Sequence, residues 1–179
     1  MKDNDAVFVE ASLDGDQSAF GTLVDRYEKK LYSAAYRITG SPEDAMDATQ
    51  SAFLKAYEKL ETFDFTYRFF SWIYRIAMNE ALNLVRRRRQ VTDLDDRTPD
   101  SRLGPEQRVS GKETGRLIEE AMWGLNPDHR AVIVLRHMEG LSYGEIGEVL
   151  EIPAKTVKSR LFSARRELRT ALLDRGVSR

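Results

Sequence analysis

The chain has 179 residues, of which 41% are hydrophobic and 32% are charged, yet its formal net charge is only -1. This length and apolar content suit one ordinary domain or two small ones and exclude a disordered tail, and any charged functional surface must arise from segregation of charge along the chain. Cysteine is absent, which excludes disulfide frameworks, thiolate nucleophiles and cysteine-ligated zinc.

Helical periodicity dominates residues 6–89. Apolar residues recur there at helical spacing, with breaks at Gly15, at residues 40–42 and in the aromatic-rich stretch 62–70. These breaks predict four helices, and three of the helices carry apolar stripes that can close on one core. The stripes are formed by Phe20, Leu23, Val24, Tyr27 and Leu31, by Ala45, Ala48, Ala52, Phe53, Ala56, Tyr57 and Leu60, and by Phe69, Trp72, Ile73, Ile76 and Ala77.

The periodicity stops between residues 90 and 112, where acidic residues, prolines and glycine accumulate. This composition is typical of an extended acidic linker. We therefore predict an all-α chain with a first domain of residues 1–90, a flexible linker of residues 91–112 and a second domain of residues 113–179. The second domain carries further apolar helical positions between Leu117 and Met138, followed by a short final pair of helices.

The final pair of helices has the pattern of a helix-turn-helix. Ser142 and Glu145 form a capping box that opens a short helix. Pro153 suits the first turn of the next helix, which is predicted to run from about Ala154 past Leu168. We expect the apolar positions to face inward and the opposite face to be basic. The inward positions are Val157, Leu161, Ala164 and Leu168, and the opposite face carries Lys155, Lys158, Ser159, Phe162, Ser163, Arg166 and Arg169.

This basic face has two interpretations. A run of charges on a helix is usually only a solvated surface. Here a capped short helix, a tight turn and a basic second helix occur together, and this combination favours DNA binding in a major groove.

Aromatic and basic residues gather at the last predicted helix of the first domain. Phe63, Phe65 and Tyr67 lie in a predicted loop, and the helix that follows ends in four arginines, residues 86–89. Aromatic rings beside a basic helix end resemble a device that binds single-stranded nucleic acid. The alternative is a core role for the aromatic rings, which we favour for Phe69 and Trp72 because both lie on the apolar stripe. For the four arginines we favour contact with nucleic acid.

These motifs together resemble the extracytoplasmic-function (ECF) RNA polymerase sigma factors of the sigma-70 family. The family's second domain is matched by QSAF at 17–20 with Tyr27, by DATQSAFLKAY at 47–57 and by FSWIYRIAMN at 70–79. Its fourth domain is matched by GLSYGEIG at 140–147 and by IPAKTVKSRL at 152–161. The resemblance implies two small helical domains, sigma domain 2 and sigma domain 4, with bacterial core RNA polymerase and promoter DNA as partners.

The resemblance also implies roles for individual residues. Those implied to dock on polymerase are Asp44, Asp47, Gln50 and Phe53. Those implied to open and read the minus-ten element are Phe63, Phe65, Tyr67, Arg68, Asn79, Asn83, Arg86 and Arg87. Those implied to read the minus-thirty-five element are Lys155, Lys158, Ser159, Arg160, Phe162 and Arg165. The linker would thread toward the RNA exit path, its acidity mimicking nucleic acid.

The chain departs from the family pattern at two places. Ser163 stands where the family usually has an arginine. In the polymerase-docking helix, Met46 and Ser51 stand where the family has carboxylates. Because a phosphate would restore negative charge facing polymerase arginines, we hypothesise that a Ser/Thr kinase activates the chain at Thr49, or at Ser51. Sequestration by an anti-sigma factor is the alternative mode of control.

Two other classes of function fit the sequence less well. A stand-alone helix-turn-helix regulator leaves the aromatic loop, Asn79 and Asn83 without a role. An enzyme is not expected, because the sequence shows no P-loop, Rossmann glycine pattern, nucleophile elbow or metal-ligand cluster. His129 and His137 have no third ligand nearby, so no metal or cofactor is predicted. The acidic N-terminus lacks an apolar run, so we expect a cytoplasmic protein without membrane insertion.

Overall fold

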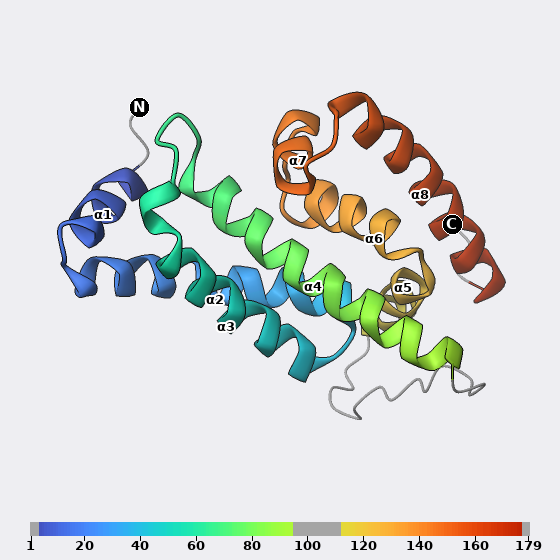
Figure 1. Cartoon of the computed structure of the whole chain (residues 1–179). Helices are drawn as coiled ribbons and strands as arrows, with labels where there is room; N and C mark the ends of the chain where they lie inside the picture. Colours follow the sequence, from blue (N-terminus) through green and yellow to red (C-terminus); the bar gives the residue numbers. More distant parts are fainter. Residues whose placement is uncertain (1–3, 95–111, 177–179) are drawn as a thin grey trace.

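The computed structural model describes residues 4–94 and 112–176, and the described residues form helices without any strand. Figure 1 shows these helices in two groups, and the buried apolar residues of both groups belong to one continuous cluster. The first group comprises α1 (Asn4–Leu13), α2 (Gln17–Thr39), α3 (Pro42–Glu58), a 3₁₀ turn η1 (Leu60–Thr62) and α4 (Phe69–Leu94). The second comprises α5 (Lys112–Gly124), α6 (Pro127–Ile133), a π-helical turn η2 (Val134–Met138), α7 (Tyr143–Leu150) and α8 (Ala154–Asp174). The all-α prediction is therefore confirmed.

Local capping signals explain where the helices of the first domain begin and end. Asp16 accepts a 2.9 Å hydrogen bond from the backbone N–H of Ser18 at the start of α2. Gly40 ends α2 with φ 69°, a left-handed conformation that glycine adopts without strain. Ser41 caps α3, and Pro42 occupies its first turn. The four helices predicted for residues 6–89 are all present.

The core of the first domain lies between α2, α3 and α4, which pack on one another. The predicted apolar stripes supply it, with Leu23, Leu31, Ala48 and Ile73 fully buried. α4 runs to Leu94, so its last residues belong to the segment predicted as linker. The rest of the predicted linker, residues 95–111, lies outside the described residues.

The second domain contains the predicted helix-turn-helix. Ser142 and Glu145 form the predicted capping box at the start of α7. After α7 the chain turns through Glu151, whose φ of 54° is left-handed. A Cβ at Gly147 would lie only 2.7 Å from the carbonyl oxygen of Ile152, so glycine is required there for the turn to close against α7. Val157, Leu161 and Ala164 face inward as predicted, each at most 1% exposed.

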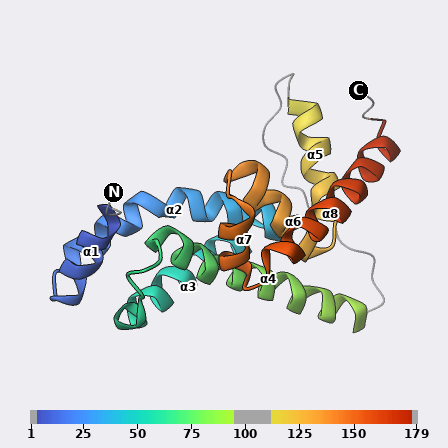
Figure 2. The ribbon, with the colours of Figure 1, turned by 90° about the horizontal axis from the view of Figure 1, so that it is seen from above.

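The two domains also pack against each other. α7 and α6 contact α4, while α5, α6 and η2 contact α2. Figures 1 and 2 show α7 lying over α4 and α8 on the outer side of the second domain. No helix among the described residues is long and apolar enough to cross a membrane.

Candidate nucleic-acid interface

Helix α8 presents an outward face of basic, polar and aromatic side chains. Its inner face is anchored in the core against α6 and α7, which fixes the direction of the outer face. The phenyl ring of Phe162 is 70% exposed, whereas its neighbour Leu161 is 1% exposed. The exposed residues among those predicted for the minus-thirty-five element are Lys155, Lys158, Ser159, Phe162 and Arg165. A surface of cations around an apolar ring suits phosphates and base edges in a major groove.

Arg160 is placed differently from these exposed residues. Its guanidinium is partly buried and lies 3.9 Å from the carboxylate of Asp128 in α6. The structure therefore directs the Arg160 side chain back toward its own domain.

Arg165 is oriented by a histidine of the preceding π-helical turn. Its Nε donates a hydrogen bond of 3.3 Å to Nε2 of His137. Burial and the nearby cations Arg165 and Arg136 lower the pKa of His137 below its ordinary value. His137 is therefore a neutral acceptor at pH 7, and it holds Arg165 without neutralising its charge.

The aromatic segment before α4 divides into buried and exposed rings. Phe69 and Trp72 are 1% and 8% exposed, which confirms the core role favoured for them. Phe63 is also buried, at 6% exposed, with its ring centroid 5.4 Å from that of Trp72. Phe65 and Tyr67 are 47% and 56% exposed. Only these last two rings are free to meet an unstacked base directly.

A cavity of about 220 Å³ lies beside the exposed rings. It combines aromatic walls with two carboxylates, two aliphatic hydroxyls and a guanidinium, so it can stack and hydrogen-bond one planar polar group. Asp64 also accepts a 2.8 Å hydrogen bond from the backbone N–H of Thr66, which shapes the loop, and this contact lowers the pKa of Asp64. The lining residues are Thr62, Phe63, Asp64, Tyr67, Ser71, Trp72, Arg75 and, from α7, Glu148.

Three of the four arginines at residues 86–89 of α4 contact other parts of the chain. All four side chains are exposed, and Arg86 forms a 2.9 Å ion pair with Asp128 of the second domain. Arg88 donates to the carbonyl of Thr39 and lies 3.0 Å from Asp44. Arg89 donates to the carbonyl of Leu125.

Arg86, Arg88 and Arg89 all contact other parts of the chain, so the nucleic-acid role favoured for the whole run would require these three arginines to exchange those contacts. Of the two predicted amides, Asn83 is exposed and Asn79 is half-buried.

Helix α3 carries a mixed polar and apolar outer face. Asp47 and Gln50 are exposed, as predicted for a docking surface. Phe53 is instead 9% exposed and belongs to the core. Leu54 is 66% exposed and Tyr57 49% exposed, so they provide the apolar part of this face. The sequence patterns did not lead us to predict Leu54 for this face. Its position directly after the core residue Phe53 indicated that it would point away from the core.

Thr49, the first candidate phosphorylation site, lies on the buried side of α3. Its side chain is 2% exposed, and its hydroxyl donates a 2.7 Å hydrogen bond to the carbonyl of Ala45. A kinase could reach this hydroxyl only if α3 opened locally. Ser51 is half-exposed and is the more accessible of the two candidates.

Sequence reasoning also missed the contacts between the domains. Each of four contacts joins a donor from residues 68–86 to a carboxylate of the second domain. They are Arg68–Glu145 and Arg75–Glu151, both 3.7 Å, Arg86–Asp128 at 2.9 Å and Tyr74–Glu139 at 2.8 Å. Within the described parts of the chain, no cluster of side chains could hold a metal ion.

Comparisons with known proteins cover nearly the whole chain. Residues 23–91 match the family model described as Sigma-70 region 2, and residues 115–168 match the model described as Sigma-70, region 4. The chain is 36% identical over 172 residues to the ECF RNA polymerase sigma factor SigW of Bacillus subtilis, covering 89% of this chain and 92% of that relative. It is 36% identical over 173 residues to the ECF RNA polymerase sigma-E factor of Escherichia coli K12, covering 90% of each.

Two solved structures resemble the chain across both domains. CnrH, in complex with the cytosolic domain of CnrY, has a TM-score of 0.73 at 30% identity and covers 97% of this chain and 99% of its own. The sigma factor RpoE from Bartonella quintana, in complex with the anti-sigma factor NepR, has a TM-score of 0.72 at 26% identity and covers 89% and 98%. The likeness therefore includes the arrangement of the two helical groups as well as the folds within them.

Proposed function

Because this chain belongs to the extracytoplasmic-function sigma factors of the sigma-70 family, we propose that it directs core RNA polymerase to promoters through the surfaces of α3, α4 and α8. The resemblance predicted from the motifs is confirmed. Sigma factors bind core polymerase and promoter DNA, so the chain is a transcription initiation factor and not an enzyme. These partners imply that it acts in the cytoplasm.

The exposed face of α3 is proposed to dock on polymerase. Asp47 and Gln50 offer a charge and an amide, and Leu54 offers an exposed apolar side chain beside them. An apolar anchor within a polar rim is the usual composition of an energetically important contact. Asp44 contributes less freely, since its carboxylate is 3.0 Å from Arg88.

The loop and cavity before α4 are proposed to receive the minus-ten element. Phe65 and Tyr67 are exposed rings on which bases can stack, and the adjacent cavity is lined by both aromatic and polar groups. Asn83, Arg86 and Arg87 continue this surface along α4.

The outer face of α8 is proposed to read the minus-thirty-five element in duplex DNA. The observation that carries the proposed function is the helix-turn-helix itself, in which the capping box and the Gly147 turn hold α8 with Lys155, Lys158 and Phe162 outward. A stand-alone regulator is not favoured, because the matches cover region 2 as well as region 4.

Binding of the purified chain to core RNA polymerase tests the docking proposal. Leu54→Ala should weaken binding at least about fivefold, because a central apolar anchor is lost. Val7→Ala is the matched control, since Val7 is 58% exposed on α1, away from the proposed face. Equal loss in both variants, or loss in neither, would contradict docking through α3.

Regulation by an anti-sigma factor is the form of control that we propose first. It is supported by the similarity to two structures solved with CnrY and with the anti-sigma factor NepR, which extends across both domains. Activation by a Ser/Thr kinase is proposed second, at Ser51 in preference to Thr49, because Thr49 is buried.

The two modes of control predict different results for phosphomimetic variants. Under kinase control, Ser51→Glu tightens binding to core polymerase. Thr49→Glu instead lowers the urea midpoint of unfolding, because it buries an unpaired carboxylate. If Ser51→Glu leaves core binding unchanged, kinase control at Ser51 is ruled out.

A further inference from the structure

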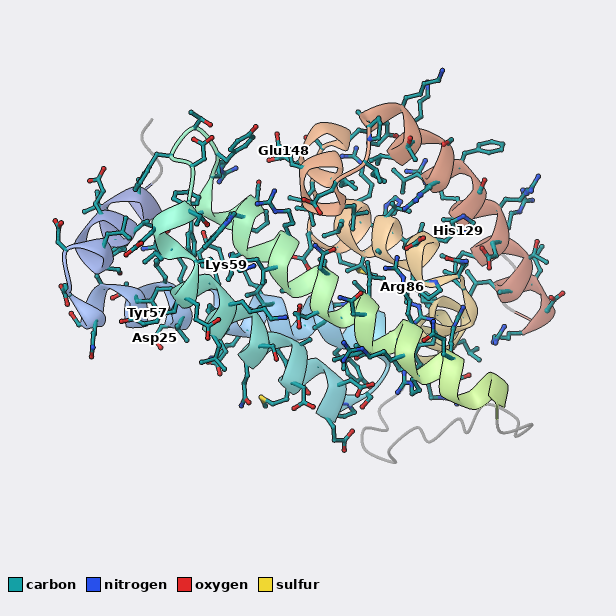
Figure 3. The ribbon with its side chains drawn as sticks, in the orientation of Figure 1. Asp25, Tyr57, Lys59, Arg86, His129 and Glu148 are labelled. Carbon is teal, nitrogen blue, oxygen red and sulfur yellow. The ribbon has the colours of Figure 1, made fainter. Side chains whose placement is uncertain are left out.

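Both histidines of the chain contact helix α8. Nδ1 of His129 in α6 lies 2.6 Å from Oε2 of Glu167, and Figure 3 shows His129 between α6 and α8. Nε2 of His137 in η2 lies 3.3 Å from Nε of Arg165. The two partners are close together in α8, but one is an anion and the other is a cation. The two contacts therefore respond differently to a proton.

The contact of His129 with Glu167 does not depend on the charge of the ring. An imidazole whose Nδ1 carries a proton donates to a carboxylate whether the ring is neutral or charged. Glu167 also accepts a 3.3 Å hydrogen bond from the backbone N–H of Asn126, the N-cap of α6. These contacts fasten α8 to α6 in either charge state.

The contact of His137 with Arg165 exists in one charge state only. Arginine has no acceptor, so Nε2 of His137 must be unprotonated and the ring proton must sit on Nδ1. Protonation of Nε2 leaves two cations face to face without a hydrogen bond. Burial and the cations Arg165 and Arg136 lower the pKa of His137, so the folded chain keeps the accepting form near neutral pH. His137 also lies in a π-helical turn, a rare element that is frequent at functional sites.

Other charged side chains around η2 have partners of their own. Helices α2, α6 and α7 pack against this turn. Charged residues of these helices and of the following residue make other contacts: Arg37 with Ser33 in α2, Asp128 with Arg86 and Arg130 with Ile38 from α6, Glu145 with Ser142 at the start of α7, and Glu139 with Tyr74. Arg165 and Arg136 are the charged groups that act on His137.

The hydrogen bond engages one edge of the Arg165 guanidinium and leaves the other. Nε and Nη2 both lie 3.3 Å from Nε2 of His137, so the ring nitrogen faces the edge that these two atoms form. In the described parts of the chain nothing bonds to Nη1. The edge formed by Nη1 and Nη2 can then donate two parallel hydrogen bonds to a phosphate. A long exposed side chain that is already held in this orientation loses less conformational freedom on binding.

The place of Arg165 along α8 suits a phosphate rather than a base. Recognition helices contact base edges with their N-terminal residues. Arg165 follows Ala154, the first residue of α8, by 11 positions, which is roughly 16 Å along the helix axis. The major groove is about 12 Å wide. Arg165 therefore reaches past the groove to the sugar–phosphate backbone at its edge.

We propose that His137 is a positioning residue for the minus-thirty-five interface: the neutral ring holds Arg165 toward a DNA phosphate, and protonation of the ring releases Arg165. This inference rests on the proposed function, since it assigns the outer face of α8 to duplex DNA. An added positive charge would by itself strengthen binding to DNA. Release of Arg165 weakens it, so the sign of the pH effect identifies the mechanism.

Variants of His137 test the positioning role at about pH 7.5, where the ring is neutral. The assay is binding of the complex of the chain and core polymerase to duplex promoter DNA. His137→Ala and Arg165→Ala should each weaken binding by roughly threefold to tenfold. The double variant should bind no more weakly than Arg165→Ala alone, because the two residues act through one contact. His137→Gln should keep most of the wild-type affinity, since its side-chain oxygen can accept the same hydrogen bond.

The pH profile separates positioning from added charge. The affinity of the wild-type complex relative to the His137→Gln complex should fall by about threefold between about pH 7.5 and about pH 5.5. This ratio removes the effects of pH on polymerase and on DNA. His129→Gln, the same substitution at the other histidine that contacts α8, is the matched control and should keep the wild-type profile. A ratio that is constant, or that rises as the pH falls, overturns the proposal.

Nuclear magnetic resonance of the free chain tests the hydrogen bond without DNA. The ¹⁵Nε resonance of Arg165 should shift as His137 takes up a proton, and it should stay in place over the same range in His137→Gln. A resonance of Arg165 that does not respond to His137, or equal promoter binding by wild type and His137→Ala, overturns the proposal. Failure of the wild-type complex to bind any promoter DNA overturns the proposed function and the DNA contact with it, while the resonance still decides whether His137 holds Arg165.

Discussion

The hydroxyl of Tyr74 in α4 donates a 2.8 Å hydrogen bond to Oε2 of Glu139, which follows η2 in the second domain. Tyr74 is fully buried, and its ring lies 4.3 Å from that of Phe70. Burial and the Glu139 carboxylate raise the pKa of Tyr74 far above its ordinary value, so the phenol remains a donor at every ordinary pH. This contact joins residues 65 positions apart and ties the two domains together.

Tyr74→Phe should loosen the domain interface while preserving the packing of the ring. The variant removes one donor and leaves the Glu139 carboxylate without it, which costs about 1 to 3 kcal/mol. Amide hydrogen exchange in α7 should then become several-fold faster. Tyr32→Phe, at a half-buried tyrosine that stacks on Tyr36, is the control. Equal protection of α7 in wild type and Tyr74→Phe contradicts a role for this hydrogen bond.

Adjacent residues of α8 should separate stability from DNA recognition. Leu161→Ala removes a side chain that is 1% exposed and should lower the free energy of unfolding by about 2 to 5 kcal/mol. Phe162→Ala removes an exposed ring and should change the free energy of unfolding by no more than about 0.5 kcal/mol. Urea titration checks both values. Phe162→Ala should still weaken promoter binding by the polymerase complex, and a stable variant with wild-type binding would remove Phe162 from the interface.

Acidification should destabilise the second domain through His137. The pKa of His137 is lowered in the folded chain, by burial first and then by Arg165 and Arg136, from an ordinary value of 6.5. The unfolded chain therefore binds a proton at His137 more readily than the folded chain, and protonation favours unfolding. The contribution of neutral His137 to the free energy of unfolding is complete above about pH 6.5 and is lost as the pH falls through the folded pKa.

Urea midpoints at about pH 7.5 and about pH 5.5 measure this effect. The decrease in the urea midpoint from the higher to the lower pH should be smaller in His137→Gln than in the wild-type chain. The two proteins share every other side chain, so the comparison isolates His137. An identical fall in both proteins contradicts the assignment to His137.

Phosphate contacts by α8 should appear in the salt dependence of binding. Lys158→Ala should reduce the slope of log binding constant against log salt concentration by about 0.9 for the loss of one phosphate contact. The assay is binding of the polymerase complex to duplex promoter DNA. Lys30→Ala, at an exposed lysine on α2, should leave the slope unchanged. A slope unaffected by Lys158→Ala places that lysine outside the DNA interface.

Much of the fold could be predicted because its signals are local. The capping box at Ser142 and Glu145, the inward positions of α8 and the breaks at Gly15 and Gly40 all follow from residues close in sequence. The core role of Phe69 and Trp72 followed from helical spacing. Helical spacing could not predict the burial of Phe63, because Phe63 lies before α4 begins and packs against rings from that helix.

The contacts between domains could not be predicted in the same way. Glu139, Glu145 and Glu151 look like ordinary surface acids in the sequence, and their partners precede them by about 65 to 77 positions. The same limit applies to Arg88 and Arg89, since only the tertiary structure brings carbonyls of Thr39 and Leu125 to their guanidinium groups. Side-chain burial favours Ser51 over Thr49, the residue that the sequence pattern had placed first.

Promoter-directed transcription in vitro tests the central claim most directly. The purified chain is added to bacterial core RNA polymerase on a pool of genomic DNA fragments, and the 5′ ends of the transcripts are mapped. The account predicts defined start sites that share one minus-ten and one minus-thirty-five sequence and that disappear when the chain is omitted. Random start sites, or the same sites without the chain, would contradict its role as a sigma factor.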